Sequence, residues 1–568
     1  MNRPARRDVL RVAGAAAVLG VGAACARIPT DSPIARRELT GQSQPGAPYV
    51  RALPPPSDAT AQEVVSGFVQ AGVGPEDDYA VARSYLTPEA SPDWDPSSLI
   101  TIYSGSEELK VEDLGDDRFA MVLQVVALVD GRGVRSLLAG PVTREIEVAV
   151  EQIDDQWRLS EVPDGIFLSE AAFETLYGPA RLYFLDSRQR HLVPDHRWFP
   201  LRRGAEAVLE ALVGGPATFL EGAVTNQVPP ASDIADAATT TGVDGTAKFA
   251  VPPAIANLPH EQRILALSQL EASLRSLRTL SGVRLVQDGQ DVVLEEQDRP
   301  ERTLPGHRPI AAGPTGVISL SEPGAAGPPE QLVPGFADLE VSAPVIAQDG
   351  VLAAALDPEE SSVLITAADG SRDVREAATG GAFVAPRVDD AGFVWTSIRS
   401  SPGALLALSG QGSDLDAKVD APWLVGREIL ALDIAADATR MIVLSSDAGG
   451  ARVDLCAVVR DGEGVPTSLT EPVPVRTFLT DVTQAVWYDE IALIVLGTEP
   501  STDERRAQIV DYVNGRESLP ALVSGTDRIA GSVVAEAVWA GTADGELLRS
   551  DGESWTPVDV EGRDPSFY

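Results

Sequence analysis

The sequence predicts a multidomain protein that is α+β in its first half and all-β in its second half. Its 568 residues are enough for about three or four domains, each with its own hydrophobic core. Amphipathic helices and strands occur together up to about residue 296, and a Pro- and Gly-rich stretch follows at 305–335. Beyond it the pattern shows only short apolar strands between turns. We therefore predict two mixed domains followed by a β-propeller.

The first 24 residues have the pattern of an export signal. Four arginines precede an apolar run over 12–24, which has the length of a signal-peptide core and is too short to span a bilayer. The small residues before Cys25 resemble a lipobox, so we predict a signal peptide over 1–24 and S-diacylglycerol and N-palmitoyl groups on Cys25. An ordinary secretory signal with a chance cysteine is the alternative. Arg6 and Arg7 also resemble a twin-arginine motif, which leaves both export routes open.

The chain is strongly acidic, with a formal charge of −39. Residues 1–24 carry four Arg and one Asp, so residues 25–568 have a charge of −42. Such a surface repels nucleic acid and anionic headgroups, which argues against both as direct ligands. Membrane attachment is therefore expected to come from covalent lipid. Residues 25–56, rich in Pro, Ser, Gln and Gly, are predicted to be a disordered tether between this lipid and the first domain.

The first predicted domain, 57–170, begins with two helices. One has Val64, Val65, Phe68 and Val69 on one face and Ser57 or Asp58 as its N-cap, and the other carries Val81, Ala82, Tyr85 and Leu86. Strands are expected at Leu99–Tyr103, Arg118–Val129, Arg144–Gln152 and Trp157–Glu161. Two helices followed by an antiparallel sheet are typical of a nuclear-transport-factor-like α+β cone, and we predict that fold here.

The second predicted domain, 179–296, mixes strands and helices. Strands are expected at 181–184, 191–193, 247–251 and 283–286, and helices at 205–213 and 264–277. Gly214, Gly215 and Gly282 follow the helices, where glycine commonly ends a helix. This order predicts a compact α/β sandwich.

The third predicted domain, 310–568, is a propeller of five or six blades. Asp-Gly pairs, which favour hairpin turns, begin at residues 349, 369, 461, 544 and 551. Trp395, Trp487 and Trp539 lie in strands of similar composition, and Leu432–Leu444 has the pattern of an inner strand, a turn and a second strand.

Few residues have the spacing of a catalytic or metal site. His191 and His196 flank Asp195, and Asp186 is near in sequence, but His260 and His307 are distant, so a structural role is favoured over a metal site. No nucleophile elbow, P-loop or dinucleotide motif occurs at a strand-to-helix junction. We therefore predict no catalytic residue, no metal and no cofactor.

Three other patterns are interpreted as structural. Cys456 lies in an apolar run and is predicted to be a core residue without a disulfide partner. Ser550–Trp555 resembles the Asp-box hairpin of other propellers. The acidic pairs Asp77-Asp78 and Glu359-Glu360 are expected to be solvated loop residues in a chain with 84 acidic residues.

The assembled pattern resembles one family, the actinobacterial lipoprotein LpqB family. The densest match is Trp157–Phe199, and Cys25–Thr30, Gly67–Asp95 and Arg263–Gly289 are also similar to the family. The resemblance implies a lipobox, an N-terminal domain, a GerMN domain and a C-terminal propeller, in that order. Three lysines against 42 arginines are typical of a GC-rich genome, as in actinobacteria.

The resemblance also implies a partner and a location. Such lipoproteins bind the extracytoplasmic sensor region of an MtrB-type histidine kinase and modulate the MtrA–MtrB two-component system, which affects cell-envelope homeostasis and division. The protein is then expected on the extracytoplasmic face of the cell membrane, held by its lipid, with an unidentified cell-wall ligand as a further partner. The alternative is an envelope protein that binds or hydrolyses cell-wall glycans at the propeller mouth.

Overall fold

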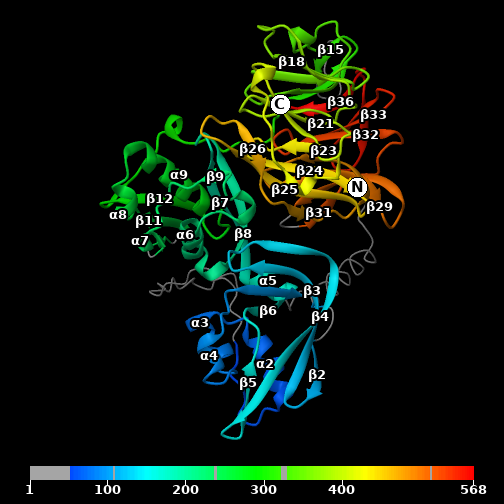
Figure 1. Cartoon of the computed structure of the whole chain (residues 1–568). Helices are drawn as coiled ribbons and strands as arrows, with labels where there is room; N and C mark the ends of the chain where they lie inside the picture. The colour runs from blue at the N-terminus through cyan, green and yellow to red at the C-terminus, as the bar shows by residue number, and fades with distance from the viewer. Residues whose placement is uncertain (1–51, 106–108, 236–238, 243, 321–328, 512–514) are drawn as a thin grey trace, which may run out of the picture. The chain divides into compact units, whose positions relative to one another are not determined.

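The computed structural model confirms a multidomain, strand-rich α+β and all-β fold (Figure 1). All the described residues belong to one compact unit. Cys25, the predicted signal peptide and nearly all of the predicted tether lie outside the described residues. The structure describes residues 52–105, 109–235, 239–242, 244–320, 329–511 and 515–568.

The first domain, blue to cyan in Figure 1, has one six-stranded sheet, in which five strands follow the order β5-β4-β3-β1-β6 and β2 pairs with β3. The pairing of β1 with β6 is parallel and the others are antiparallel. The strands are β1 (Leu99–Tyr103), β2 (Lys110–Gly115), β3 (Arg118–Asp130), β4 (Arg135–Ile153), β5 (Gln156–Glu161) and β6 (Ile166–Ser169). The helices are α2 (Ala61–Ala71), α3 (Glu76–Arg83), α4 (Ala90–Asp93) and α5 (Glu170–Leu176).

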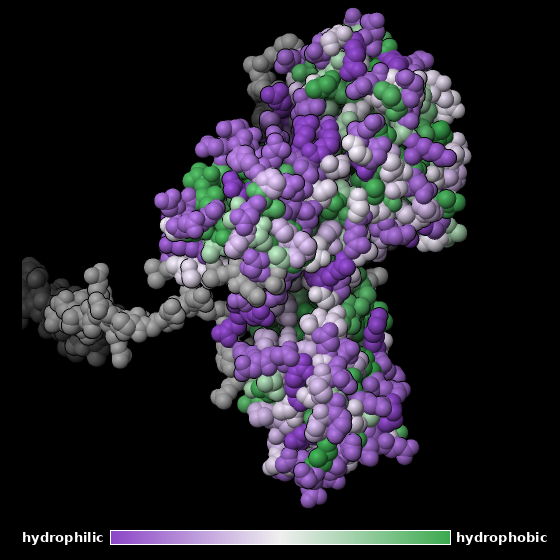
Figure 2. Space-filling model, turned by 60° about the vertical axis from the view of Figure 1, so that its left-hand side comes forward, coloured by the Kyte–Doolittle hydropathy of each residue, from purple (hydrophilic) through white to green (hydrophobic). Residues whose placement is uncertain are grey.

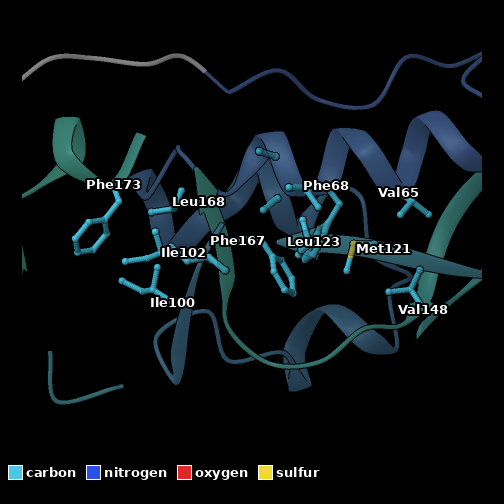
Figure 3. Close-up of a cluster of buried hydrophobic side chains, with 14 of the residues drawn as sticks. Val65, Phe68, Ile100, Ile102, Met121, Leu123, Val148, Phe167, Leu168 and Phe173 are labelled. Atoms are coloured by element: carbon cyan, nitrogen blue, oxygen red, sulfur yellow. The ribbon is translucent and has the colours of Figure 1, made fainter. Parts of the chain in front are cut away.

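The core of this domain lies between α2 and the sheet (Figure 3). Val65 and Phe68 of α2 pack over Met121 and Leu123 of β3, and all four side chains are buried. Along β3 every second residue from Phe119 to Ala127 is buried, as the alternating pattern predicts. The nuclear-transport-factor-like form of this α+β domain stays a prediction.

The two helices differ in their ends from the sequence prediction. The N-cap of α2 is Thr60 rather than Ser57 or Asp58, because Thr60 and Glu63 form a reciprocal capping box. The Thr60 hydroxyl accepts the Glu63 N–H at 3.3 Å, and the Glu63 carboxylate accepts the Thr60 N–H at 2.8 Å. Helix α3 already ends at Arg83, so Tyr85 and Leu86 are buried beyond it.

The second domain, mostly green in Figure 1, has two sheets, β8-β7-β9 and β10-β11-β12-β13. Helix α9 packs against β7 of one sheet and β12 of the other, as an α/β sandwich requires. The strands are β7 (Tyr177–Asp186), β8 (Leu192–Pro200), β9 (Val224–Thr225), β10 (Thr239–Thr241), β11 (Thr246–Ala250), β12 (Gly282–Gln287) and β13 (Gln290–Asp291). The helices are α6 (Gly204–Gly214), α7 (Ser232–Ala235), α8 (Pro253–Ala256) and α9 (His260–Arg275).

The third domain is a propeller whose described strands form six sheets. The first sheet has the order β15-β14-β36 and contains β14 (Pro309–Gly313), β15 (Gly316–Ser319) and β36 (Arg563–Phe567). The other strands, in sheet order, are β16 (Ser342–Ile346), β17 (Leu352–Leu356), β18 (Ser362–Ala367) and β19 (Arg375–Thr379); β20 (Arg387–Val388), β21 (Phe393–Ser397) and β22 (Leu405–Ser409); β23 (Glu428–Ile434), β24 (Arg440–Asp447), β25 (Gly450–Arg460), β26 (Pro466–Leu469) and β27 (Val473–Val475); β28 (Thr480–Trp487), β29 (Ala492–Glu499), β30 (Glu504–Asp511) and β31 (Gly515–Ser518); β32 (Thr526–Ser532), β33 (Ala537–Thr542), β34 (Leu547–Ser550) and β35 (Trp555–Val558).

The ring of sheets is closed by the last strand of the chain that the structure describes. Strand β36 pairs antiparallel with β14, with Pro309 opposite Phe567, and it packs against β16 and β32 of the two neighbouring sheets. The Asp564 carboxylate accepts the Ala343 N–H at 2.9 Å and lies 3.1 Å from Arg528 Nε. One side chain of β36 therefore links both neighbouring blades.

Trp395, Trp487 and Trp539 all lie in strands, as predicted, but at different positions within their blades. Trp395 and Trp539 lie in β21 and β33, the second strands of their sheets, whereas Trp487 ends β28, an innermost strand. The pattern of Leu432–Leu444 is confirmed, because it spans the end of β23, a turn and the start of β24.

Candidate functional site

The predicted candidates around His191 serve the local fold. The Asp186 carboxylate accepts the N–H groups of Arg190 at 2.6 Å and His191 at 2.7 Å, which fixes the turn between β7 and β8. Asp195 is fully buried, pairs with Arg197 at 2.5 Å and accepts the Ala217 N–H at 2.8 Å. The described part of the chain holds no group of three side chains that could bind a metal ion.

His196 lies on β8 opposite Arg181 of β7 and lines a cleft. Burial and the nearby charges of Arg181 and Arg440 lower the pKa of His196 to about 3. The imidazole is therefore neutral at ordinary pH and adds no charge to the cleft wall.

The other three patterns lie in the core, in turns and, for one acidic pair, in a helix. Cys456 is buried in β25, where burial raises the pKa of its thiol. Asp551 accepts the Glu553 and Ser554 N–H groups in the turn between β34 and β35, so the Asp-box resemblance corresponds to a hairpin. Of the acidic pairs, Glu359 and Glu360 lie between β17 and β18, as expected, but Asp77 and Asp78 lie in α3 and not in a loop, and Asp78 forms an ion pair with Arg83.

Sequence reasoning missed a polar cluster at the junction of the second domain and the propeller. Glu490 lies in the turn between β28 and β29, and its side chain is only 2% exposed. Arg302 donates to both carboxylate oxygens, from Nε at 2.7 Å and from Nη2 at 2.6 Å. Arg181 of β7 adds a contact at 3.1 Å. No sequence motif marks the cluster, because its members are more than 100 residues apart.

The pKa values of Arg302 and Tyr183 at this junction are both raised. The hydrogen bonds from Arg302 to Glu490 raise the pKa of Arg302 above its ordinary value. Burial, followed by the Glu490 charge, raises the pKa of the Tyr183 phenol, whose oxygen lies 3.5 Å from the carboxylate. The cluster therefore joins the two domains through one carboxylate that is held by two guanidinium groups.

A cleft of about 810 Å³ opens beside this junction. It is bounded by β7, by α9, by residues 296–302 and by Ile491 of the propeller. A second pocket, at the propeller centre and lined by Asp390, Asp433 and Trp487, has only about 110 Å³. Small-molecule sites commonly have about 300–1,000 Å³. The first cleft therefore has the size of a ligand site, whereas the small central pocket gives no support to the alternative of a glycan site at the propeller mouth.

The visible surface does not show one dominant apolar patch. On the face in Figure 2 hydrophilic residues predominate, and hydrophobic ones lie in small separate groups. Exposed large hydrophobic residues, such as Val293 and Val425, come from positions far apart in the sequence. None of the helices in the described ranges is long and apolar enough to cross a membrane.

The fold and the junction define the class of protein: a propeller protein in which a mixed α/β domain is fixed to the propeller. Family models identify each part. The lipoprotein LpqB N-terminal domain matches residues 54–174, the sporulation and spore germination (Germane) domain matches 181–293, and the lipoprotein LpqB beta-propeller domain matches 328–567. The chain belongs to the LpqB lipoprotein family.

Curated relatives extend this match over most of the chain. A lipoprotein LpqB of Cutibacterium acnes is 27% identical and covers 87% of this chain and 86% of its own length. A lipoprotein LpqB of Streptomyces avermitilis is 26% identical and covers 99% of this chain and 98% of its own length. A chain of a solved nidogen–laminin complex matches 46% of this chain and 97% of its own length at 10% identity. Its TM-score of 0.32 is too low to indicate a shared fold.

Proposed function

We propose that the protein is a lipoprotein held at the extracytoplasmic face of the cell membrane, where it binds and modulates the sensor kinase of the MtrA–MtrB system. Through that kinase it affects cell-envelope homeostasis and division. The observation that supports a binding role is the junction at Glu490. It fixes the Germane domain to the propeller, so residues of both domains can present one preorganised surface to a partner.

A lipid anchor at Cys25 makes a direct prediction. Cys25→Ala should release the protein from the membrane fraction or leave it as an unprocessed precursor, because no thiol remains at the lipobox to take the diacylglyceryl group. Fractionation followed by mass spectrometry of the N-terminus measures both outcomes. Cys456→Ala is the matched control and should stay membrane-bound, since Cys456 is a core residue. A Cys25→Ala protein that is mature and still in the membrane would contradict the anchor.

Binding to the kinase can be tested in cells with the full-length chain. A photocrosslinking residue placed at Val425 of the propeller or Val293 of the Germane domain, both more than 75% exposed, should capture the sensor region of the kinase from at least one position. Leu114 on the N-terminal domain, 51% exposed, is the comparison position. The same chain with Cys25→Ala should crosslink less, because it is no longer confined near the kinase. Failure to capture the kinase from all three positions would reject the proposal.

A further inference from the structure

Two Arg–Glu–Arg triads line the walls of the cleft beside the junction. In one, Glu271 of α9 pairs with Arg275 at 2.7 Å and with Arg299 at 2.9 Å. In the other, Glu490 pairs with Arg181 at 3.1 Å and Arg302 at 2.6 Å. All four arginines line the same cavity. Each triad has one more positive than negative charge, so the cleft wall is locally basic in a chain of net charge −39.

The excess charge of the triads is accessible from the cleft. The two glutamates are buried, at 10% and 2% side-chain exposure, whereas the four arginines are 27–56% exposed. A guanidinium has five N–H donors, and the glutamates use only some of them. Glu296 and Glu301 also line the cleft, and Arg278 adds a fifth arginine, so five arginines face these two glutamates and the two glutamates of the triads.

Two more side chains in the cleft have unused hydrogen-bonding capacity. Arg278, just after α9, is exposed and has no ion pair or hydrogen bond to the described residues. Ser268 of α9 is only 4% exposed, and its hydroxyl has no hydrogen-bond partner within the described ranges. A buried hydroxyl without a partner is unfavourable, so Ser268 points to a partner supplied from the cleft.

The rest of the wall is less polar and suits the body of a small ligand. Leu192, Ala272 and Ile491 line it beside the Tyr183 ring. A few fixed polar groups among apolar side chains are the usual composition of a small-molecule site.

We propose that this cleft binds a small anionic ligand of sugar size that carries a carboxylate or a phosphate. The Arg278 guanidinium and the free N–H donors of the triads hold the anionic group, and the Ser268 hydroxyl bonds to a polar group on the ligand body. The test of this site is independent of the proposed kinase contact, because ligand binding needs only this chain.

Calorimetry on the full lipidated chain in detergent, at low salt, tests the site with two matched pairs of probes. N-acetylmuramic acid should bind and N-acetylglucosamine should not, if the recognised group is a carboxylate. Glucose 1-phosphate should bind and glucose should not, if it is a phosphate. Binding of either acid with rejection of its neutral partner supports the proposal and identifies the anionic group. Binding of neither acid, or equal binding of acid and neutral sugar, overturns it.

Substitutions then locate the site. Arg278→Ala and Ser268→Ala should each lower the affinity for the acidic probe about tenfold, which is the effect expected when one hydrogen bond to a charged or buried group is lost. Arg284→Ala is the matched control, because Arg284 is an exposed β12 arginine of the same domain that does not line the cleft. Melting of each variant without ligand checks the fold. Unchanged affinity in both cleft variants, or an equal loss in Arg284→Ala, would overturn the assignment.

Discussion

A chain ending at residue 560 should lose the cooperative fold of its propeller. This truncation removes β36, which pairs with β14 and packs between β16 and β32. An opened ring exposes the edge of β14 and the apolar sides of two blades. A typical domain has a free energy of unfolding of about 5–15 kcal/mol, and we expect the truncation to remove a large part of it. Circular dichroism melting and limited proteolysis measure it, and a truncated chain that melts like the full chain would contradict ring closure by β36.

Two point variants separate strand pairing from the side-chain links at this closure. Asp564→Asn keeps a residue that tolerates the positive φ of 53° at this position but removes the charge that faces Arg528. It should lower the free energy of unfolding by about 1 kcal/mol. Arg563→Ala removes only an exposed ion pair with Glu340 and should change stability by less than about 0.5 kcal/mol. The reverse order of these two effects would show that Asp564 is not the link between blades.

Glu490→Gln should uncouple the Germane domain from the propeller. The amide keeps the size of the side chain but loses the charge that holds Arg181 and Arg302. Breaking a fully buried ion pair costs about 3–5 kcal/mol, and the partial exposure of both arginines reduces the expected cost to about 2 kcal/mol. We expect one calorimetric unfolding transition to separate into two, with faster proteolysis near residues 296–308.

The control for this junction is Glu301→Gln. Glu301 lies next to Arg302, on the segment that connects the second domain to the propeller. Its side chain is exposed, and its hydrogen bonds to β8 and to Arg190 are made by its backbone. This variant removes one acidic charge close to the junction without touching the triads, and its melting should match that of the unmodified chain. If Glu490→Gln also matches it, the buried carboxylate does not couple the two domains.

Local sequence patterns predicted the longer helices and strands of the first two domains, because hydrophobic periodicity reports which face is buried, but they missed shorter elements such as β6 and α5. Strand β1 has the predicted bounds, and β3 and α9 have the predicted buried faces. The short strand β2 was missed because five of its six residues are polar, glycine or exposed, so it lacks an apolar alternation. The α2 cap was misplaced because several residues before the helix have suitable side chains, and only the Glu63 contact selects Thr60.

Long-range pairings could not be predicted from one sequence. Glu490 meets Arg181 across 309 positions, and no spacing rule joins them before the chain folds. The same holds for Ser268, whose missing partner is visible only once α9 is packed. The position of Trp487 within its blade has a related limit: a tryptophan in a strand indicates burial, but not whether the strand is the innermost or the second of its blade.

The pairing of β14 with β36 also sets an order of events during synthesis and export. Residues 309–313 emerge about 250 positions before their partners at 563–567, so the first blade waits unfinished while five others form. The two preceding domains contain only short-range pairings by comparison and can fold meanwhile. A ribosome stall or protease cut late in the chain would therefore leave two finished domains beside an open ring, with its edges available for aggregation.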